Sequence, residues 1–247
     1  MKSFSEIFSE WNNAFPFLKK YSPSTLYQKV GPFLIGLRLD KMADDLYRIY
    51  FEIMPLWLTE RKHLGSIFLS DVLRKNGLQF SIFNRHHDLV FKEAVETAKK
   101  QYKLVLAPEI QLNDLIVYLE SESENSLHPK KMKQLDRSLT FNIELAVALY
   151  LNKKELYNDI WENIIKESSR WDAEYFKSMT NMTIEEWLME MHSKFDDRDE
   201  FMKVVEWNYQ RPRVAKLNTG HIIGVEEYTK YVRKLTWFEK IRSLFAK

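Results

Sequence analysis

The chain has 247 residues, of which 45% are hydrophobic and 14% aromatic, so it can bury a core in one large domain or two small ones. Its 37 basic and 35 acidic residues nearly cancel, and the overall charge therefore selects no class of partner. The absence of cysteine excludes disulfides, thiolate nucleophiles and cysteine-bound metals, and it is typical of a reducing compartment. No secretory signal is visible and no apolar run approaches the roughly 20 residues that cross a bilayer. These features predict a cytoplasmic protein without a transmembrane segment.

The first predicted element is an amphipathic helix within residues 3–20. Its apolar residues recur at intervals of three and four, and Ser3 or Ser5 can cap its start. The segment 21–32 contains two prolines and a glycine, which remove an amide donor and disturb regular dihedral angles. It is predicted to be a connection.

The clearest pattern in the sequence is an alternation of apolar and polar residues within 33–54, on both sides of a short acidic turn. Such a period of two is typical of an antiparallel sheet with one buried face, and it predicts a β-hairpin. The segments 64–69 and 78–83 are rich in Ile, Leu and Phe and can extend the sheet to three or four strands, although 64–75 also fits a short helix. The apolar positions of the hairpin are Phe33, Ile35, Leu37, Leu39, Tyr47, Ile49, Phe51 and Ile53.

From residue 86 onward the apolar spacing becomes helical. Thr183 and Glu186 have the spacing of a capping box, and the Ser- and Glu-rich stretch 120–125 is predicted to be a surface loop. The predicted helices cover 86–102, 110–119, 131–151, 155–168, 183–195, 198–209 and 225–245.

The expected fold is therefore α+β and predominantly α. An N-terminal region, 1–107, holds one helix and a small antiparallel sheet of three or four strands. A larger helical region, 108–247, follows, and the two regions can also form one continuous domain.

The run Arg85-His86-His87-Asp88 contains the residue types of metal sites and proton transfer. Adjacent helical residues point about 100° apart, so His86 and His87 cannot share an ion as a pair four residues apart can. Capping of a helix by Asn84 or Asp88 is the favoured interpretation. We predict no catalytic residue, metal site or cofactor, and His86, His87 and Asp88 remain the candidates for a metal-dependent hydrolase.

A second cluster lies between the predicted helices 198–209 and 225–245. Its aromatic rings offer stacking faces and its guanidinium groups can bind phosphate or carboxylate groups, which suits a binding loop. The alternative is a structural connector whose aromatics cover the core and whose Asn218 and Thr219 cap the last helix. The candidate binding residues are Trp207, Tyr209, Arg211, Arg213, Lys216 and His221.

Charge is distributed unevenly along the second half of the chain. Residues 152–200 contain 13 acidic and 7 basic residues, whereas 211–247 contain 9 basic and 3 acidic ones. The two segments can dock against each other, or the basic segment can contact a partner. The run 130–133 followed by Arg137 can also contact phosphates through charge alone.

No nucleotide-binding, nucleophile-elbow, zinc-protease or kinase motif occurs in the sequence. We therefore expect a non-catalytic, cytoplasmic and bacterial interaction protein that occupies the surface of a protein partner, as an inhibitor, immunity or accessory factor. The alternatives are a nucleic-acid-binding protein that uses the basic C-terminal segment and the hydrolase named above. The sequence sets no oligomeric state.

Overall fold

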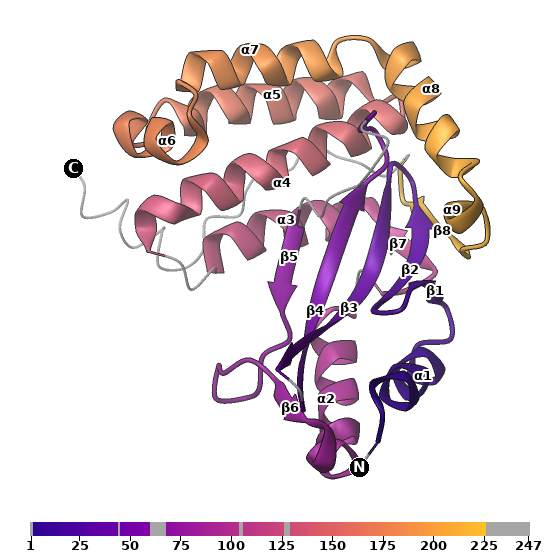
Figure 1. The fold of residues 1–247 in the computed structure, drawn as a ribbon. Coiled ribbons are helices and arrows are strands. Elements are labelled where there is room, and N and C mark those ends of the chain that lie inside the picture. Colours follow the sequence, from indigo (N-terminus) through magenta and orange to yellow (C-terminus); the bar gives the residue numbers. More distant parts are fainter. Residues whose placement is uncertain (1, 44, 60–67, 104–105, 126–128, 226–247) are drawn as a thin grey trace.

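The structure is a computed structural model that describes residues 2–43, 45–59, 68–103, 106–125 and 129–225. The chain has an α+β fold in which helices pack around one curled sheet (Figure 1). The strands are β1 (Lys19–Ser22), β2 (Thr25–Val30), β3 (Phe33–Ala43), β4 (Leu46–Pro55), β5 (Phe68–Asp71), β6 (Ser81–Phe83), β7 (Glu109–Gln111) and β8 (Thr219–Ile223). The helices are α1 (Phe4–Ala14), α2 (His87–Gln101), α3 (Leu112–Asn125), α4 (Lys130–Tyr150), α5 (Lys154–Ser168), α6 (Ala173–Thr180), α7 (Ile184–Phe195), α8 (Arg198–Tyr209) and α9 (Pro212–Ala215), with a 3-10 turn η1 (Asn84–His86) before α2.

The sheet is larger than the sequence pattern predicts, and the predicted small antiparallel sheet of three or four strands is wrong. Within the described ranges eight strands join in the order β5-β4-β3-β2-β8-β7, with β1 beside β2 and β6 beside β4. The sheet is mixed, because β8 runs parallel to both β2 and β7 while the other pairs are antiparallel. It curls into a half-barrel.

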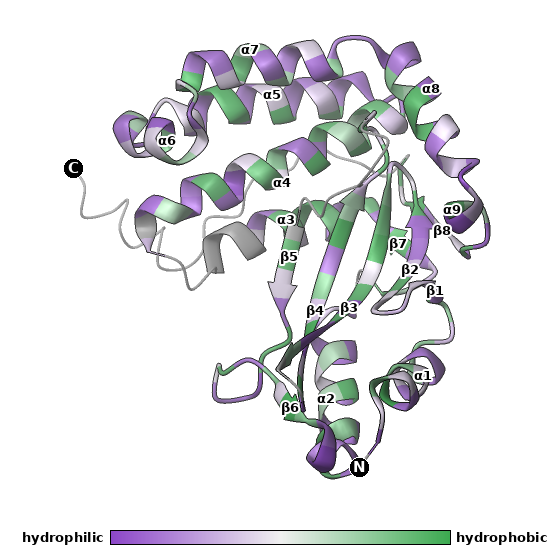
Figure 2. Cartoon of the chain, in the orientation of Figure 1, coloured by the Kyte–Doolittle hydropathy of each residue, from purple (hydrophilic) through white to green (hydrophobic). Residues whose placement is uncertain are grey.

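The hairpin itself lies where the alternation places it. Strands β3 and β4 pair from Phe33↔Pro55 to Ala43↔Leu46. All eight apolar positions of the pattern are fully buried, and green residues alternate with paler and purple ones along both strands in Figure 2. Gly36 sits where β2 approaches closely, since a Cβ atom there would lie 1.9 Å from the carbonyl oxygen of Leu26. Only glycine fits this position without moving the β2 backbone.

The predicted connection 21–32 is instead mostly strand. In β2, Leu26, Tyr27 and Gln28 are all buried, so both faces of the strand are covered. A strand buried on both faces shows no alternation of polar and apolar residues. The short strands β7 and β8 were also not predicted, because their partners lie far away in the sequence and their own length of three to five residues gives no period.

Several predicted helices are confirmed. Of the two predicted caps of the first helix, Ser3 is the one used, the predicted capping box at Thr183 is formed, and α8 spans the predicted residues. The loop predicted at 120–125 is wrong, because α3 continues through it to Asn125. Glutamate is a good helix former, so a polar stretch can extend a helix whose first turns are anchored in the core. The predicted helix 225–245 lies almost wholly outside the described residues.

The helices cover the sheet from two directions. Helices α1 and α2 pack on the buried face of the hairpin, where the Trp11 and His87 side chains reach Tyr47. The Phe51 ring stacks on Tyr102 at 4.5 Å and meets Tyr118 of α3 edge to face. Helix α4 packs between α3 and α5, while α8 and α9 run down to β8 (Figure 1).

Strands β7 and β8 lie beyond residue 107 and join the same sheet as the N-terminal strands. The division into 1–107 and 108–247 stays a prediction. None of the helices in the described part of the chain is long and apolar enough to cross a membrane.

Candidate functional site

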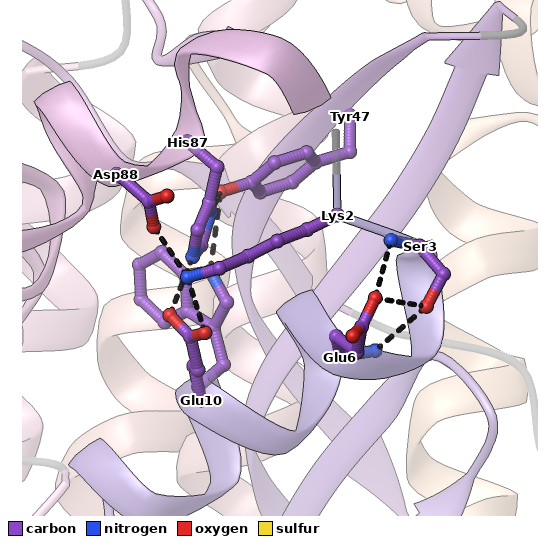
Figure 3. Close-up of polar contacts among 8 residues, drawn as sticks. Lys2, Ser3, Glu6, Glu10, Tyr47, His87 and Asp88 are labelled. Carbon is purple, nitrogen blue, oxygen red and sulfur yellow. Dashed lines mark hydrogen bonds and ion pairs between the residues drawn. The ribbon is translucent and has the colours of Figure 1, made fainter.

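Two places in the fold gather the residues that the sequence singles out. The first is the start of α2, where His87 turns into the core and is fixed at both ring nitrogens (Figure 3). Its Nδ1 lies 2.8 Å from the Tyr47 hydroxyl, and its Nε2 lies 2.9 Å from Glu10 Oε2 on α1. Trp11 Nε1 donates to the same Tyr47 hydroxyl at 3.4 Å. The histidine therefore ties α1, α2 and β4 together.

Lys2 completes this cluster from the segment before α1. Its ammonium group contacts Asp88 Oδ1 and lies 2.5 Å from Glu10 Oε1, so one cation faces two carboxylates. The hydrogen bonds from Lys2 lower the pKa of both carboxyl groups below their usual values. Burial raises the pKa of the Tyr47 hydroxyl, which is fully buried and stays neutral.

The structure does not unite the three catalytic candidates of the sequence. His86 is exposed and its ring meets Phe83 edge to face, whereas His87 is buried. Asp88 joins His87 only through Lys2 and Glu10, two residues that sequence reasoning missed. No local signal could have found them, because Glu10 lies 77 residues before His87.

A separate charged cluster, outside these two places, is buried between α3, α4 and α5. The Arg137 guanidinium faces three carboxylates: it bonds Glu144, donates to Glu167 Oε2 at 3.2 Å and lies 3.8 Å from Glu120 Oε1. Arg137 is 6% exposed and also packs on the Phe141 ring at 3.7 Å. Arg137 is therefore not placed to contact phosphate groups. The interpretation of the basic run 130–133 followed by Arg137 as a phosphate contact does not hold for Arg137.

Glu144 is the most deeply buried acid of this cluster, with 1% exposure. Burial raises the pKa of its carboxyl to about 7, against the opposing attraction of Arg137. The cluster can hold or release a proton near neutral pH, but it is closed to solvent on the Glu144 side.

The second place is the end of α8 and the short helix α9, which carry most of the predicted binding residues. Trp207 is 48% exposed and lines a surface hollow of about 410 Å³ with Thr59, Glu200, Lys203 and Val204. The Arg211 guanidinium lies 5.7 Å from the centre of the Trp207 ring. A large aromatic ring and an arginine are thus presented together.

Tyr209 points the other way. Its hydroxyl donates to the Gly31 carbonyl oxygen at 2.5 Å, and the Lys29 ammonium lies over its ring. Asn208, which is buried, donates to the carbonyl oxygens of Leu56 and Leu58, just after β4. These two residues fasten α8 to the sheet, so of the two predicted aromatic binding residues only Trp207 is largely exposed.

The remaining predicted binding residues lie in α9, at its C-terminal end and in β8. Arg213, Lys216 and His221 are all exposed. The predicted caps of the last helix have other places: Asn218 donates to the Phe17 carbonyl oxygen, and Thr219 begins β8. The next residue of β8 is Gly220, where β8 lies between β2 and β7. A Cβ atom at this position would lie 2.9 Å from the Pro108 carbonyl oxygen, which explains the glycine.

Comparison of this chain with protein-family models, with curated proteins and with solved structures finds no match in any of the three.

Proposed function

We propose that this chain is a protein-binding module that docks a partner on the α8–α9 surface, which we define by Trp207, Arg211, Arg213 and Lys216. It acts by occupying the partner, as an inhibitor, immunity or accessory factor, and it does so in the cytoplasm. The observation that carries the proposal is the half-exposed Trp207 ring beside Arg211 at the edge of a hollow. Tryptophan and arginine are enriched among the residues that dominate the free energy of protein association.

The exposed area of the Trp207 ring sets its contribution to the free energy of binding. A tryptophan side chain buries up to about 250 Å², so an exposure of 48% leaves roughly 100 Å² for a partner to cover. At about 25 cal/mol per Å², covering this area contributes roughly 2.5 kcal/mol. That value is typical of an interface hot spot.

The charge on the α9 side of Trp207 favours an acidic partner, whereas Glu200 and Lys203 pair with each other at the hollow and Glu206 precedes the ring. From Trp207 to His221 the sequence holds Arg211, Arg213 and Lys216 and no acidic residue. Arg213 and Lys216 are exposed, while the partly exposed Arg211 donates to Asn208. Exposed cations at the rim of an interface chiefly raise the association rate, and their effect falls as salt rises.

The same cations support the nucleic-acid alternative, which needs stacking as well as charge. Tyr209, the second stacking candidate, is instead fastened to Gly31. The surface therefore presents one stacking ring rather than two, which suits a protein partner better than a single-stranded nucleic acid.

The test is affinity capture with the tagged full-length chain, split into nuclease-treated and untreated halves. Trp207→Ala and Arg213→Glu change the proposed surface. The matched controls are Met189→Ala, which removes a 65% exposed apolar side chain on α7, and Arg170→Glu, which reverses an exposed charge between α5 and α6.

The proposal expects one protein that survives nuclease, is retained by the wild type and both controls, and is lost from both surface variants. Equal retention by all variants contradicts it. Loss of the partner on nuclease treatment moves the assignment to nucleic acid.

A further inference from the structure

The cluster at the start of α2 has a donor set that the protein-binding function does not use. Glu10, His87 and Asp88 each offer one ligand atom, and these three atoms lie within 4.8 Å of one another. They come from two helices that meet on the buried face of the hairpin, so their backbones are held by the core (Figure 3).

We propose that Glu10, His87 and Asp88 form a binding site for a first-row divalent metal ion such as Zn²⁺, and that the Lys2 ammonium competes with the ion for this site. The proposal is independent of the α8–α9 surface. One imidazole nitrogen and two carboxylate oxygens are ligands that Zn²⁺ accepts, with water completing the coordination.

The first two ligands lie close to the spacing that an ion requires. Ligand atoms that bind one Zn²⁺ tetrahedrally at about 2.1 Å lie about 3.4 Å apart. His87 Nε2 and Glu10 Oε2 are hydrogen-bonded at 2.9 Å, so they must separate by about half an ångström and lose the shared proton when the ion binds. Asp88 closes the remaining distance by rotating its side chain, which is 71% exposed and is released when the Lys2 ammonium leaves.

Tyr47 supplies the outer contact that metal-bound histidines ordinarily have. When Nε2 binds the ion, the imidazole proton resides on Nδ1 and is donated to the Tyr47 hydroxyl oxygen 2.8 Å away. That oxygen then accepts from both His87 and Trp11, which a hydroxyl with two lone pairs permits. The ring is thus held with Nε2 toward the two carboxylates.

Lys2 shows that the cluster accommodates a cation. Its ammonium bonds both carboxylates, and the resulting electrostatic attraction is the one that a divalent ion would use more strongly. Lys2 is only 30% exposed in its side chain but belongs to the segment before α1, so it can leave without unfolding a helix. Removal of the ammonium is therefore expected to strengthen metal binding.

The experiment measures Zn²⁺ binding to the full-length chain by calorimetry at pH 7, with Mg²⁺ as the comparison ion. Lys2→Met removes the competing ammonium, and Lys92→Met removes an equal charge from an exposed position one turn after Asp88 on α2. His86→Ala removes the neighbouring exposed histidine that is outside the cluster. Asp88→Asn, made in the Lys2→Met background, removes a ligand at an exposed position where folding is not at stake.

The proposal expects Lys2→Met to bind one equivalent of Zn²⁺ at least tenfold more tightly than the wild type, with Lys92→Met and His86→Ala within threefold of it. Asp88→Asn should weaken binding at least tenfold, Mg²⁺ should bind at least a hundredfold more weakly than Zn²⁺, and the ¹⁵N NMR signal of His87 Nε2 should shift on Zn²⁺ addition. An affinity unchanged by Lys2→Met, or lost in His86→Ala but kept in Asp88→Asn, overturns the proposal.

Discussion

The buried cluster around Arg137 makes the free energy of unfolding depend on pH. The pKa of Glu144 is about 7 in the folded chain, whereas an exposed glutamate has a value near 4.5. Because the folded state holds the proton more tightly, this stabilising contribution is complete below about pH 4.5 and is lost as pH rises through 7. Each pKa unit corresponds to about 1.4 kcal/mol, so the loss amounts to about 3 kcal/mol.

Glu144→Gln tests this reasoning, because glutamine keeps the shape of the protonated acid and cannot ionise. We expect urea unfolding at pH 5, 6, 7 and 8 to show a free energy that falls with pH more steeply in the wild type than in Glu144→Gln. The difference should grow by about 3 kcal/mol between the acidic and alkaline limits. Glu155→Gln, which changes an exposed acid on α5, is the control. Its free energy of unfolding should change with pH in the same way as that of the wild type.

The companion variant Arg137→Met leaves Glu144 without its cation. At pH 8 it should cost about 3–5 kcal/mol, since an unpaired buried charge remains, and at pH 5 the cost should be smaller because Glu144 is protonated. Parallel stability curves for the wild type and Glu144→Gln across this pH range would refute the argument.

Three further substitutions test the packing of the fold. Gly36→Ala places a Cβ atom 1.9 Å from the Leu26 carbonyl oxygen, so the β2 backbone must move and a loss of about 3 kcal/mol or more is expected in urea unfolding. Asn208→Ala removes two buried hydrogen bonds that fasten α8 to the end of β4, with an expected cost of about 2 kcal/mol, whereas Asn158→Ala on the exposed side of α5 should change stability by less than about 0.5 kcal/mol. Thr183→Ala breaks the capping box of α7, and thermal unfolding should show a loss of about 1 kcal/mol that Thr183→Ser restores.

The parts of the fold that the sequence predicts are those with a local period. The strands β3 and β4 are 11 and 10 residues long, and their alternation is visible because one face is buried and the other is partly polar. The helices α4, α5, α7 and α8 likewise carry a period and, at Thr183, a capping signal.

What the sequence does not predict depends on contacts between distant segments. Strand β2 is covered on both faces and pairs with β8 about 190 residues further on, at Lys29↔Thr219. The same limit applies to the candidate sites, since no local pattern places Lys2 and Glu10 beside Asp88. The direction of Tyr209 is also set by Gly31, 178 residues earlier, and so a loop rich in aromatic residues divides into one anchor and one exposed ring.

The most direct test of the proposed function is the affinity of the purified chain for the protein that it captures. Calorimetry should give a dissociation constant that Trp207→Ala raises between tenfold and a hundredfold, in line with the roughly 2.5 kcal/mol assigned to the exposed ring. Met189→Ala should leave it within twofold. If Trp207→Ala binds the partner as tightly as the wild type does, the α8–α9 surface is not the docking site and the proposed function fails.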